Sequence, residues 1–153
     1  MIFLLPFSRS FLLDNCYTYS LHDWLIRVSD MDHIMAVLLN GVAQLEYDRT
    51  RALPPHQAAY LDKMDAKMDK GIELDHTFIE QPDLDTKARF IAANLLSAIK
   101  NDDEAMAASL CTWLANRLPE LKQVKYVESG DEIMIDMVFD EAYQKQVAVQ
   151  LTH

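Results

Sequence analysis

The sequence predicts an α+β fold in which helices come first and a small sheet comes last. From Met31 to about Pro119, apolar residues recur every three or four positions, which is the period of an amphipathic helix. From Val124 onward they alternate with polar residues, which is the period of a half-buried strand. Helices and strands in separate parts of a chain are typical of α+β proteins. We therefore expect an N-terminal helical part of about four helices in two helical hairpins, followed by a C-terminal three-stranded antiparallel sheet packed on the helices.

The first predicted helix follows Ser29 and Asp30, whose side chains can cap a helix. Its apolar stripe consists of Ile34, Leu38, Val42 and Leu45. Gly41 would lie in the middle of this helix at a cost of about 1 kcal/mol relative to alanine, so we expect another backbone to pack closely there. The segment 50–55 (TRALPP) ends the helix, because its prolines lack an N–H and push the preceding residue out of the helical region.

Three further helices are expected between Pro55 and Pro119. The second helix covers about residues 55–70, and the third follows Asp83 or Asp85 as its cap. The fourth begins at 101–104, where a capping residue is followed three positions later by a glutamate. Because the link between the third and fourth helices is so short, they should form an antiparallel hairpin. The apolar stripes of these helices contain Leu61, Met64, Met68, Leu84, Ala88, Ile91, Leu95, Ile99, Met106, Leu110, Trp113 and Leu114.

Three short strands are expected after the last helix, at residues 124–128, 133–139 and 147–151. The sequence Ser129-Gly130-Asp131 has the chemistry of a turn and joins the first two strands into a hairpin. Each strand has one apolar face, which the helices should cover. The last strand is expected at an edge of the sheet, and an exposed edge can accept a strand from a partner.

Residues 1–30 differ in composition from the rest of the chain. They hold six of the fourteen aromatic residues and contain no Glu, Lys, Ala or Gly. They lack the basic start and the cleavage site of a secretory signal, and their apolar runs are too short to span a membrane. Two interpretations stay open: translated upstream sequence before a true start at Met31, or a flexible or membrane-surface segment of the native protein. Residues 31–153 are expected to form a single α+β domain.

The chain is acidic, with a formal net charge of −10 and a pI of about 4.8. Nucleic-acid binding needs a basic surface, and no window concentrates Lys and Arg with aromatic residues. Cys16 and Cys111 are far apart and form no CxxC pair, which argues against a thiolate zinc site and against a secreted disulfide framework. We expect a soluble cytoplasmic protein that does not bind nucleic acid and that could meet a membrane only through residues 1–30.

The stretch YLDKMDAKMDKGIELDH, residues 60–76, gathers acidic residues and one histidine. On a helix, Asp62, Asp65 and Asp69 share one face, between an apolar stripe and a basic stripe. Such a stripe spreads its charges along a line at about 5 Å per turn, whereas a metal site needs carboxylates that converge on one point. Gly71 is expected to end the helix. We therefore interpret the three aspartates as the solvent-facing side of the helix.

Glu73, Asp75 and His76 lie beyond this helix and are the only candidates, all weak, for a metal site. Glu73 and His76 have the Glu-x-x-His spacing of di-iron helical bundles. Those sites need a second such pair and two further glutamates, and the chain has no second Glu-x-x-His. An ordinary loop position explains His76 better. No metal site and no cofactor is therefore expected.

The sequence shows no assembled catalytic set. Its three glycines are unpaired and cannot form a phosphate-binding loop, and Ser109 has no histidine nearby in sequence. We expect an interaction or regulatory module without its own catalytic site, whose partner is another protein. A basic partner is favoured, because the negative charge of this chain would attract it and speed their association. The alternative is a small metal-binding protein or enzyme that uses His33, His56 or His76 with neighbouring acids, above all His76 with Glu73. No oligomeric state is predicted.

Overall fold

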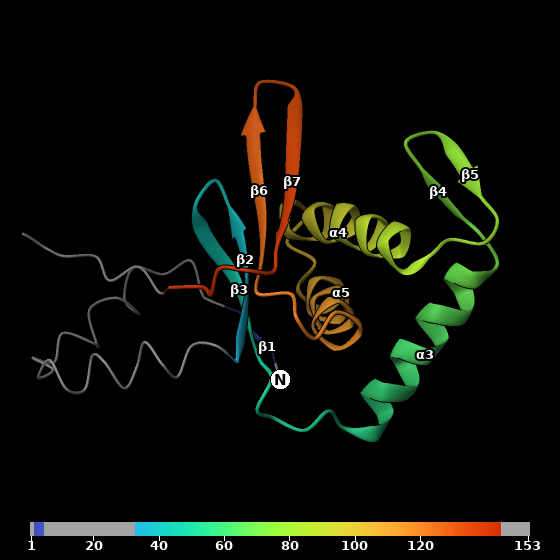
Figure 1. Cartoon of the computed structure of the whole chain (residues 1–153), viewed down its shortest axis with the longest axis horizontal. Coiled ribbons are helices and arrows are strands. Elements are labelled where there is room, and N and C mark those ends of the chain that lie inside the picture. Colours follow the sequence, from blue (N-terminus) through green and yellow to red (C-terminus); the bar gives the residue numbers. More distant parts are fainter. Residues whose placement is uncertain (1, 5–32, 145–153) are drawn as a thin grey trace, which may run out of the picture.

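The computed structural model describes residues 2–4 and 33–144, and in these it contains three helices and two sheets (Figure 1). The first strands are β1 (Ile2–Leu4), β2 (Ile34–Leu39) and β3 (Val42–Asp48). They are followed by α3 (Pro55–Asp69), β4 (Ile72–Leu74), β5 (Thr77–Ile79), α4 (Leu84–Lys100), α5 (Glu104–Arg117), β6 (Gln123–Ser129) and β7 (Glu132–Val138). The prediction that four helices precede all strands is therefore wrong.

Residues 34–48, predicted as a helix, form the β2–β3 hairpin. The run from Met35 to Leu38 is buried at every position, so both faces of β2 are covered and its apolar pattern has no period that excludes a helix. The hairpin turns at Asn40 and Gly41, with φ angles of 50° and 82°, the left-handed conformations that a type I′ turn requires. A Cβ at Gly41 would meet nothing within 4 Å, so the turn conformation explains this glycine and the expected close backbone contact is absent.

The large sheet is mixed and has the strand order β1-β3-β2-β6-β7. β6 pairs in parallel with β2, and the other neighbouring strands pair antiparallel. A parallel pair needs a long crossover, which here contains all three helices. The hairpin predicted within 124–139 is present as β6 and β7, but it extends a sheet begun by the N-terminal strands and does not form an antiparallel sheet of its own. The strand predicted at 147–151 lies outside the described residues.

The residue ranges of α3, α4 and α5 agree closely with those of the second, third and fourth predicted helices. Asp83 caps α4 by accepting a hydrogen bond from the Thr86 N–H at 2.8 Å, and Asp103 caps α5 by accepting from the Met106 N–H at 3.1 Å. α4 and α5 pack against each other, and the helices lie on one side of the large sheet (Figure 1). Within the described ranges, no helix has both the length and the apolar character needed to cross a membrane.

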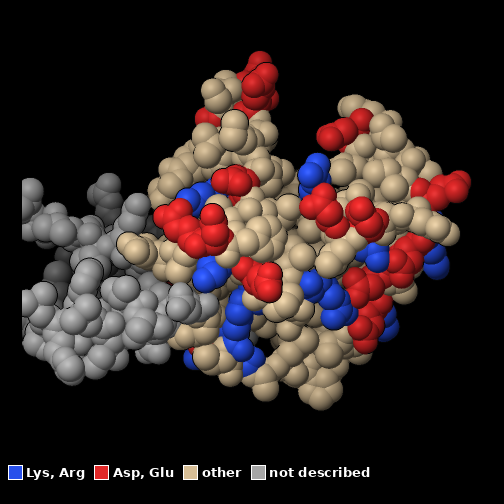
Figure 2. Space-filling model, viewed as in Figure 1, with Lys and Arg blue, Asp and Glu red and all other residues tan. Residues whose placement is uncertain are grey.

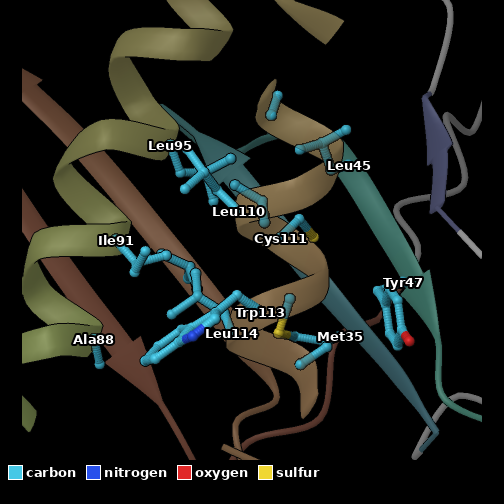
Figure 3. Packing of buried hydrophobic residues seen from close by; sticks show 14 of the residues in the cluster. Met35, Leu45, Tyr47, Ala88, Ile91, Leu95, Leu110, Cys111, Trp113 and Leu114 are labelled. Carbon is cyan, nitrogen blue, oxygen red and sulfur yellow. The ribbon is translucent and has the colours of Figure 1, made fainter. Parts of the chain in front are cut away.

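α5 is the central helix of the core. Its residues Cys111, Trp113 and Leu114 have no exposed surface, and they lie between α4 and the strands of the sheet (Figure 3). The surrounding side chains shown there include Met35, Leu45, Tyr47, Ala88, Ile91 and Leu95. A helix that is apolar on nearly all sides is expected where two layers cover it. α5 therefore packs against both α4 and the sheet, and its side chains connect the two layers.

β4 and β5 form a separate two-stranded hairpin that projects beyond α4 (Figure 1). Its turn residues Asp75 and His76 have φ angles of 50° and 61°. Gly71, which was predicted to end the preceding helix, follows the C-cap Lys70 at a φ of 122°. The φ of 122° favours glycine here, and a Cβ at Gly71 would also displace the exposed ring of Phe78 on β5.

Candidate protein interface

β7 ends the large sheet on one side, so among the described residues its outer edge pairs with no strand. Together with β6 it projects as a hairpin from the body of the protein (Figure 1). Its register with β6 runs without a bulge from Val138 opposite Gln123 to Glu132 opposite Ser129. An unpaired edge presents a row of backbone N–H and C=O groups, which is a template for an incoming strand.

The bonds on the far side of β6 show which backbone groups of β7 face this edge. The carbonyl of Tyr126 accepts a hydrogen bond from the Asn40 N–H at 2.8 Å, so Tyr126 directs its backbone groups toward β2 and away from β7. In an antiparallel pair, a residue that directs its groups away from the neighbouring strand lies opposite one that does the same. Ile135 lies opposite Tyr126, so its N–H and C=O point to the free edge. Ile133 and Met137, two positions to either side, do likewise.

The outer part of this hairpin exposes apolar side chains. On β7, Ile133, Met134 and Ile135 are 45%, 68% and 37% exposed. Val127, opposite Met134 on β6, and Phe139, directly after β7, are also exposed. Single exposed apolar residues are common on protein surfaces, but a group of them on one projecting hairpin marks an interaction surface.

The only protection that β7 carries against pairing with other edge strands is the charge of Glu132 and Asp136. Natural edge strands are protected by proline, by lysine or by a bulge. The sequence of β7, EIMIDMV, contains neither proline nor lysine, and its pairing with β6 is regular. A long apolar edge of this kind is prone to aggregate unless a partner strand covers it or charge repels other copies.

The same hairpin is strongly acidic. From residue 126 to residue 141 the chain has no Lys or Arg, and its acids are Glu128, Asp131, Glu132, Asp136, Asp140 and Glu141. Acidic side chains gather at the tip of the hairpin in the space-filling view (Figure 2). Such a surface repels acidic molecules, including other copies of this chain, and attracts basic ones.

The β2–β3 turn and α4 hold the hairpin near its tip, at Glu128, the second-last residue of β6. The Asn40 side chain accepts a hydrogen bond from the Glu128 N–H at 2.9 Å and donates one to the Glu128 carboxylate at 3.3 Å. Lys100, the last residue of α4, forms an ion pair with the same carboxylate. Hydrogen bonds from Lys100 and then from Asn40 hold the pKa of Glu128 below its ordinary value. These contacts fix β6 near the tip of the hairpin, beside the outer half of β7.

Asp62, Asp65 and Asp69 of α3 were interpreted as a solvent-facing stripe, but each of them contacts a neighbouring helix. The carboxylate of Asp65 accepts from the indole N–H of Trp113 at 2.7 Å and from Nε of Arg117 at 2.8 Å. Arg117 also pairs with Asp62, at 2.9 Å. Asp69 pairs with Lys87 of α4. These carboxylates attach α3 to the other two helices, which is a structural role.

Glu73, Asp75 and His76 lie on one hairpin but do not form a site. Glu73 is on β4, opposite Phe78, whereas Asp75 and His76 form the turn, and all three are exposed. The Glu-x-x-His pair therefore falls on a strand and a turn, not on the helix that a di-iron bundle requires. In residues 2–4 and 33–144, no group of three or more His, Cys, Asp or Glu side chains is placed to hold a metal ion.

The other two histidines named as candidates lie apart from that hairpin. Nε2 of His33 is 3.7 Å from the carboxylate of Asp48. His56 lines an open pocket of about 470 Å³ between α3 and α5. Ser109 lines the same pocket, and the sequence could not show this because the two residues are far apart in the chain. The residues around this pocket are His56, Gln57, Tyr60, Leu61, Ala108, Ser109 and Thr112. The Ser109 hydroxyl donates to the carbonyl of Ala105 at 3.0 Å, so its proton is not directed toward His56 and no activated nucleophile is formed.

Comparison of the chain with protein-family models, with curated proteins and with solved structures found no match. The edge strand expected at 147–151 lies outside the described residues; among those that are described, the edge strands of the large sheet are β1 and β7. The run Ile133-Met134-Ile135 was the available signal, because three successive apolar residues on a strand place apolar side chains on both faces.

Proposed function

We propose that this protein is an interaction or regulatory module without a catalytic site, which binds a partner protein through the edge of β7. The observation that carries the proposal is the outward-facing backbone of Ile133, Ile135 and Met137, on a strand with exposed apolar side chains and without proline, lysine or a bulge. A segment of the partner would add to the sheet as a further strand. Its main-chain hydrogen bonds would supply affinity, and its alternate side chains would supply specificity.

Binding of this kind needs a rigid edge, because ordering both partners at once would reduce the affinity. The contacts of Glu128 with Asn40 and Lys100 supply that rigidity near the tip of the hairpin. Cellular location is part of the proposal: two cysteines without a disulfide pattern fit a reducing compartment such as the cytoplasm. Cys111 is a free thiol in the core.

Substitutions at Ile135 can distinguish addition of a partner strand to the β7 backbone from binding to the β7 side chains alone. Ile135→Pro removes an N–H that points outward and leaves the ladder between β6 and β7 intact, because proline is tolerated where the N–H of an edge strand faces solvent. Ile135→Thr is the matched control, since it reduces the apolar surface but retains the N–H and the β-branched shape. We expect chemical cross-linking in cells of the native source to recover the same partners with wild type and Ile135→Thr, and to lose them with Ile135→Pro.

Two results would contradict the proposal. One is equal recovery of partners with Ile135→Pro, which would mean that the edge is not used. The other is the absence of any cross-linked partner whose recovery depends on this position. Both variants must first show the wild-type circular dichroism spectrum and similar urea midpoints, so that a lost partner reflects the edge and not unfolding.

A further inference from the structure

The two faces of β7 differ in chemistry. Ile135 lies opposite Tyr126, and Met137 lies opposite Val124; both of these β6 residues belong to the core beneath the helices. Side chains alternate along a strand, so Ile133, Ile135 and Met137 all lie on the face that carries the helices. A strand added to β7 would therefore meet only apolar neighbours on this face.

The opposite face of β7 combines charge with one apolar residue. Glu132, Met134 and Asp136 follow one another on this face, and all three are exposed. Lys125 lies opposite Asp136 on β6, whereas Glu132 lies opposite Ser129 and has no basic neighbour in the register. The negative charge on this face is therefore concentrated toward the tip of the hairpin.

From this difference between the faces, and resting on the proposed function, we propose that the segment that adds to β7 alternates aliphatic residues with Lys or Arg. Its aliphatic side chains lie beside Ile133, Ile135 and Met137 on the helical face. Its basic side chains lie beside Glu132 and Asp136 on the other face. Opposite charges on neighbouring strands stabilise a sheet, and like charges destabilise it.

A second copy of this chain fits the edge poorly. Two β7 strands paired antiparallel about Ile135 would place Met134 opposite Asp136 and Glu132 opposite Val138, so apolar residues would face acids. The pairing would also bring together two hairpins that each lack any Lys or Arg from residue 126 to residue 141. Electrostatic repulsion between them opposes such a dimer. The partner is therefore a basic segment of another protein.

Synthetic peptides test this chemistry on the intact chain. The probe is a fluorescein-labelled peptide of alternating Lys and Val, and its controls are a peptide of alternating Glu and Val and a peptide with the Lys and Val residues in two blocks. We expect fluorescence anisotropy at low salt to show that the alternating Lys–Val peptide binds at least about tenfold more tightly than either control. Equal binding of the block peptide would overturn the inference, because charge alone would then explain the affinity.

N-methylation of the probe tests the strand pairing without changing the protein. If the added strand is antiparallel to β7, the residues beside Ile135 on the helical face, here the valines, direct their amides toward β7. If it is parallel, the lysines do so. We expect methylation of one set of amides to abolish binding and methylation of the other to be tolerated, and the sensitive set identifies the direction. Tolerance of both methylated peptides would exclude strand addition.

Charge reversal on the protein tests the position of the basic residues. Glu132→Lys should weaken the Lys–Val peptide by about tenfold, because it places a like charge beside the added strand. Glu120→Lys is the control: it changes the net charge equally, and Glu120 is an exposed residue before β6, at the end of that strand away from the tip. Equal weakening by both substitutions would show that only the overall charge matters, and would contradict the inference.

The failure of this inference and the failure of the proposed function give different results. If native partners depend on Ile135 but the Lys–Val peptide has no advantage over its controls, strand addition stands and the basic chemistry is wrong. If the Lys–Val peptide binds Ile135→Pro as well as it binds wild type, the edge is not the binding site and both fail. Concentration-dependent dimerisation of the wild-type chain in sedimentation, lost in Ile135→Pro, would show that a second copy is the occupant and would overturn the inference.

Discussion

The indole N–H of Trp113 donates a hydrogen bond to the carboxylate of Asp65, with a distance of 2.7 Å between the two atoms. Trp113 has no exposed surface, whereas Asp65 lies on α3 at the boundary of the core. Arg117 binds the second oxygen of the same carboxylate. α3 buries only Leu61 and Met68 of its own residues, so its attachment to the core depends strongly on this polar contact.

Asp65→Ala should lower the free energy of unfolding by about 2–3 kcal/mol, because it leaves the buried indole N–H and Arg117 without their acceptor. Asp62→Ala, which also removes a partner of Arg117 but from an exposed position, should lower it by less than about 1 kcal/mol. Urea denaturation followed by tryptophan fluorescence measures both changes. Similar values for the two variants would show that Asp65 contributes no more than a surface ion pair.

Arg49 provides a second polar contact to the core. Its guanidinium donates hydrogen bonds to the carbonyls of Ala115 and Leu118, at the C-terminal end of α5, and of Leu121, in the connection to β6. Helix C-termini carry unpaired carbonyls and a negative dipole end, both of which favour a cation. Arg49, which directly follows β3, therefore supplies hydrogen-bond donors to the unpaired carbonyls at the C-terminal end of α5.

Arg49→Met should destabilise the protein by about 2–4 kcal/mol, because an apolar chain of similar length leaves several part-buried carbonyls unpaired. Arg89→Met on α4 removes only an exposed ion pair with Asp85 and should change the free energy of unfolding by less than about 0.5 kcal/mol. Thermal and urea denaturation of the three proteins compare these effects. A neutral Arg49→Met would mean that water replaces the guanidinium at no cost.

Gly41 distinguishes the hairpin from the helix first predicted for residues 34–48. In the middle of a helix, Gly41→Ala would stabilise the protein by up to about 1 kcal/mol. At the observed φ of 82°, alanine is strained, and the same substitution should destabilise it by about 1 kcal/mol. The sign of the change in urea midpoint therefore decides between the two structures, with no dependence on its exact size.

Local signals identified some elements of this fold and missed others for definable reasons. Asp83 starts α4 through a predicted side-chain cap that depends only on a residue three positions away. The cap predicted for α5, the residue three positions before Glu104, is wrong: Asp103 caps α5, and Asn101 is the C-cap of α4. β2 was missed because its burial on both faces erases the alternation of a strand, although Asn40-Gly41 is a strong hairpin signal that the helical pattern outweighed. The pairing of β2 with β6 joins Ala36 to Gln123, and no local pattern specifies so distant a register.

The candidate interface was predictable only in part. The acidity of residues 126–141 and the strands at 124–128 and 133–139 can be read from the sequence. The strand order makes β7 an edge, and the bond between Asn40 and Tyr126 shows that Ile135 directs its backbone outward; both depend on pairing between residues far apart in the chain. The role of Asp65 was missed for the same reason, since its partners Trp113 and Arg117 lie on another helix.

Cys111 makes the stability of the protein fall at alkaline pH. Burial in the core raises the pKa of its thiol to about 12, and the charge of Arg49 opposes this shift. In the unfolded chain a thiol has a pKa of about 8.5, so above that pH the unfolded state loses a proton that the folded state keeps, and stability is lost as the pH rises toward 12. We expect the free energy of unfolding to fall between about pH 7.5 and 9.5 by about 1 kcal/mol more with Cys111 present than in Cys111→Ala. Urea denaturation of both proteins in a Cys16→Ser background measures this difference, and parallel pH profiles would mean that the thiol also ionises in the folded state.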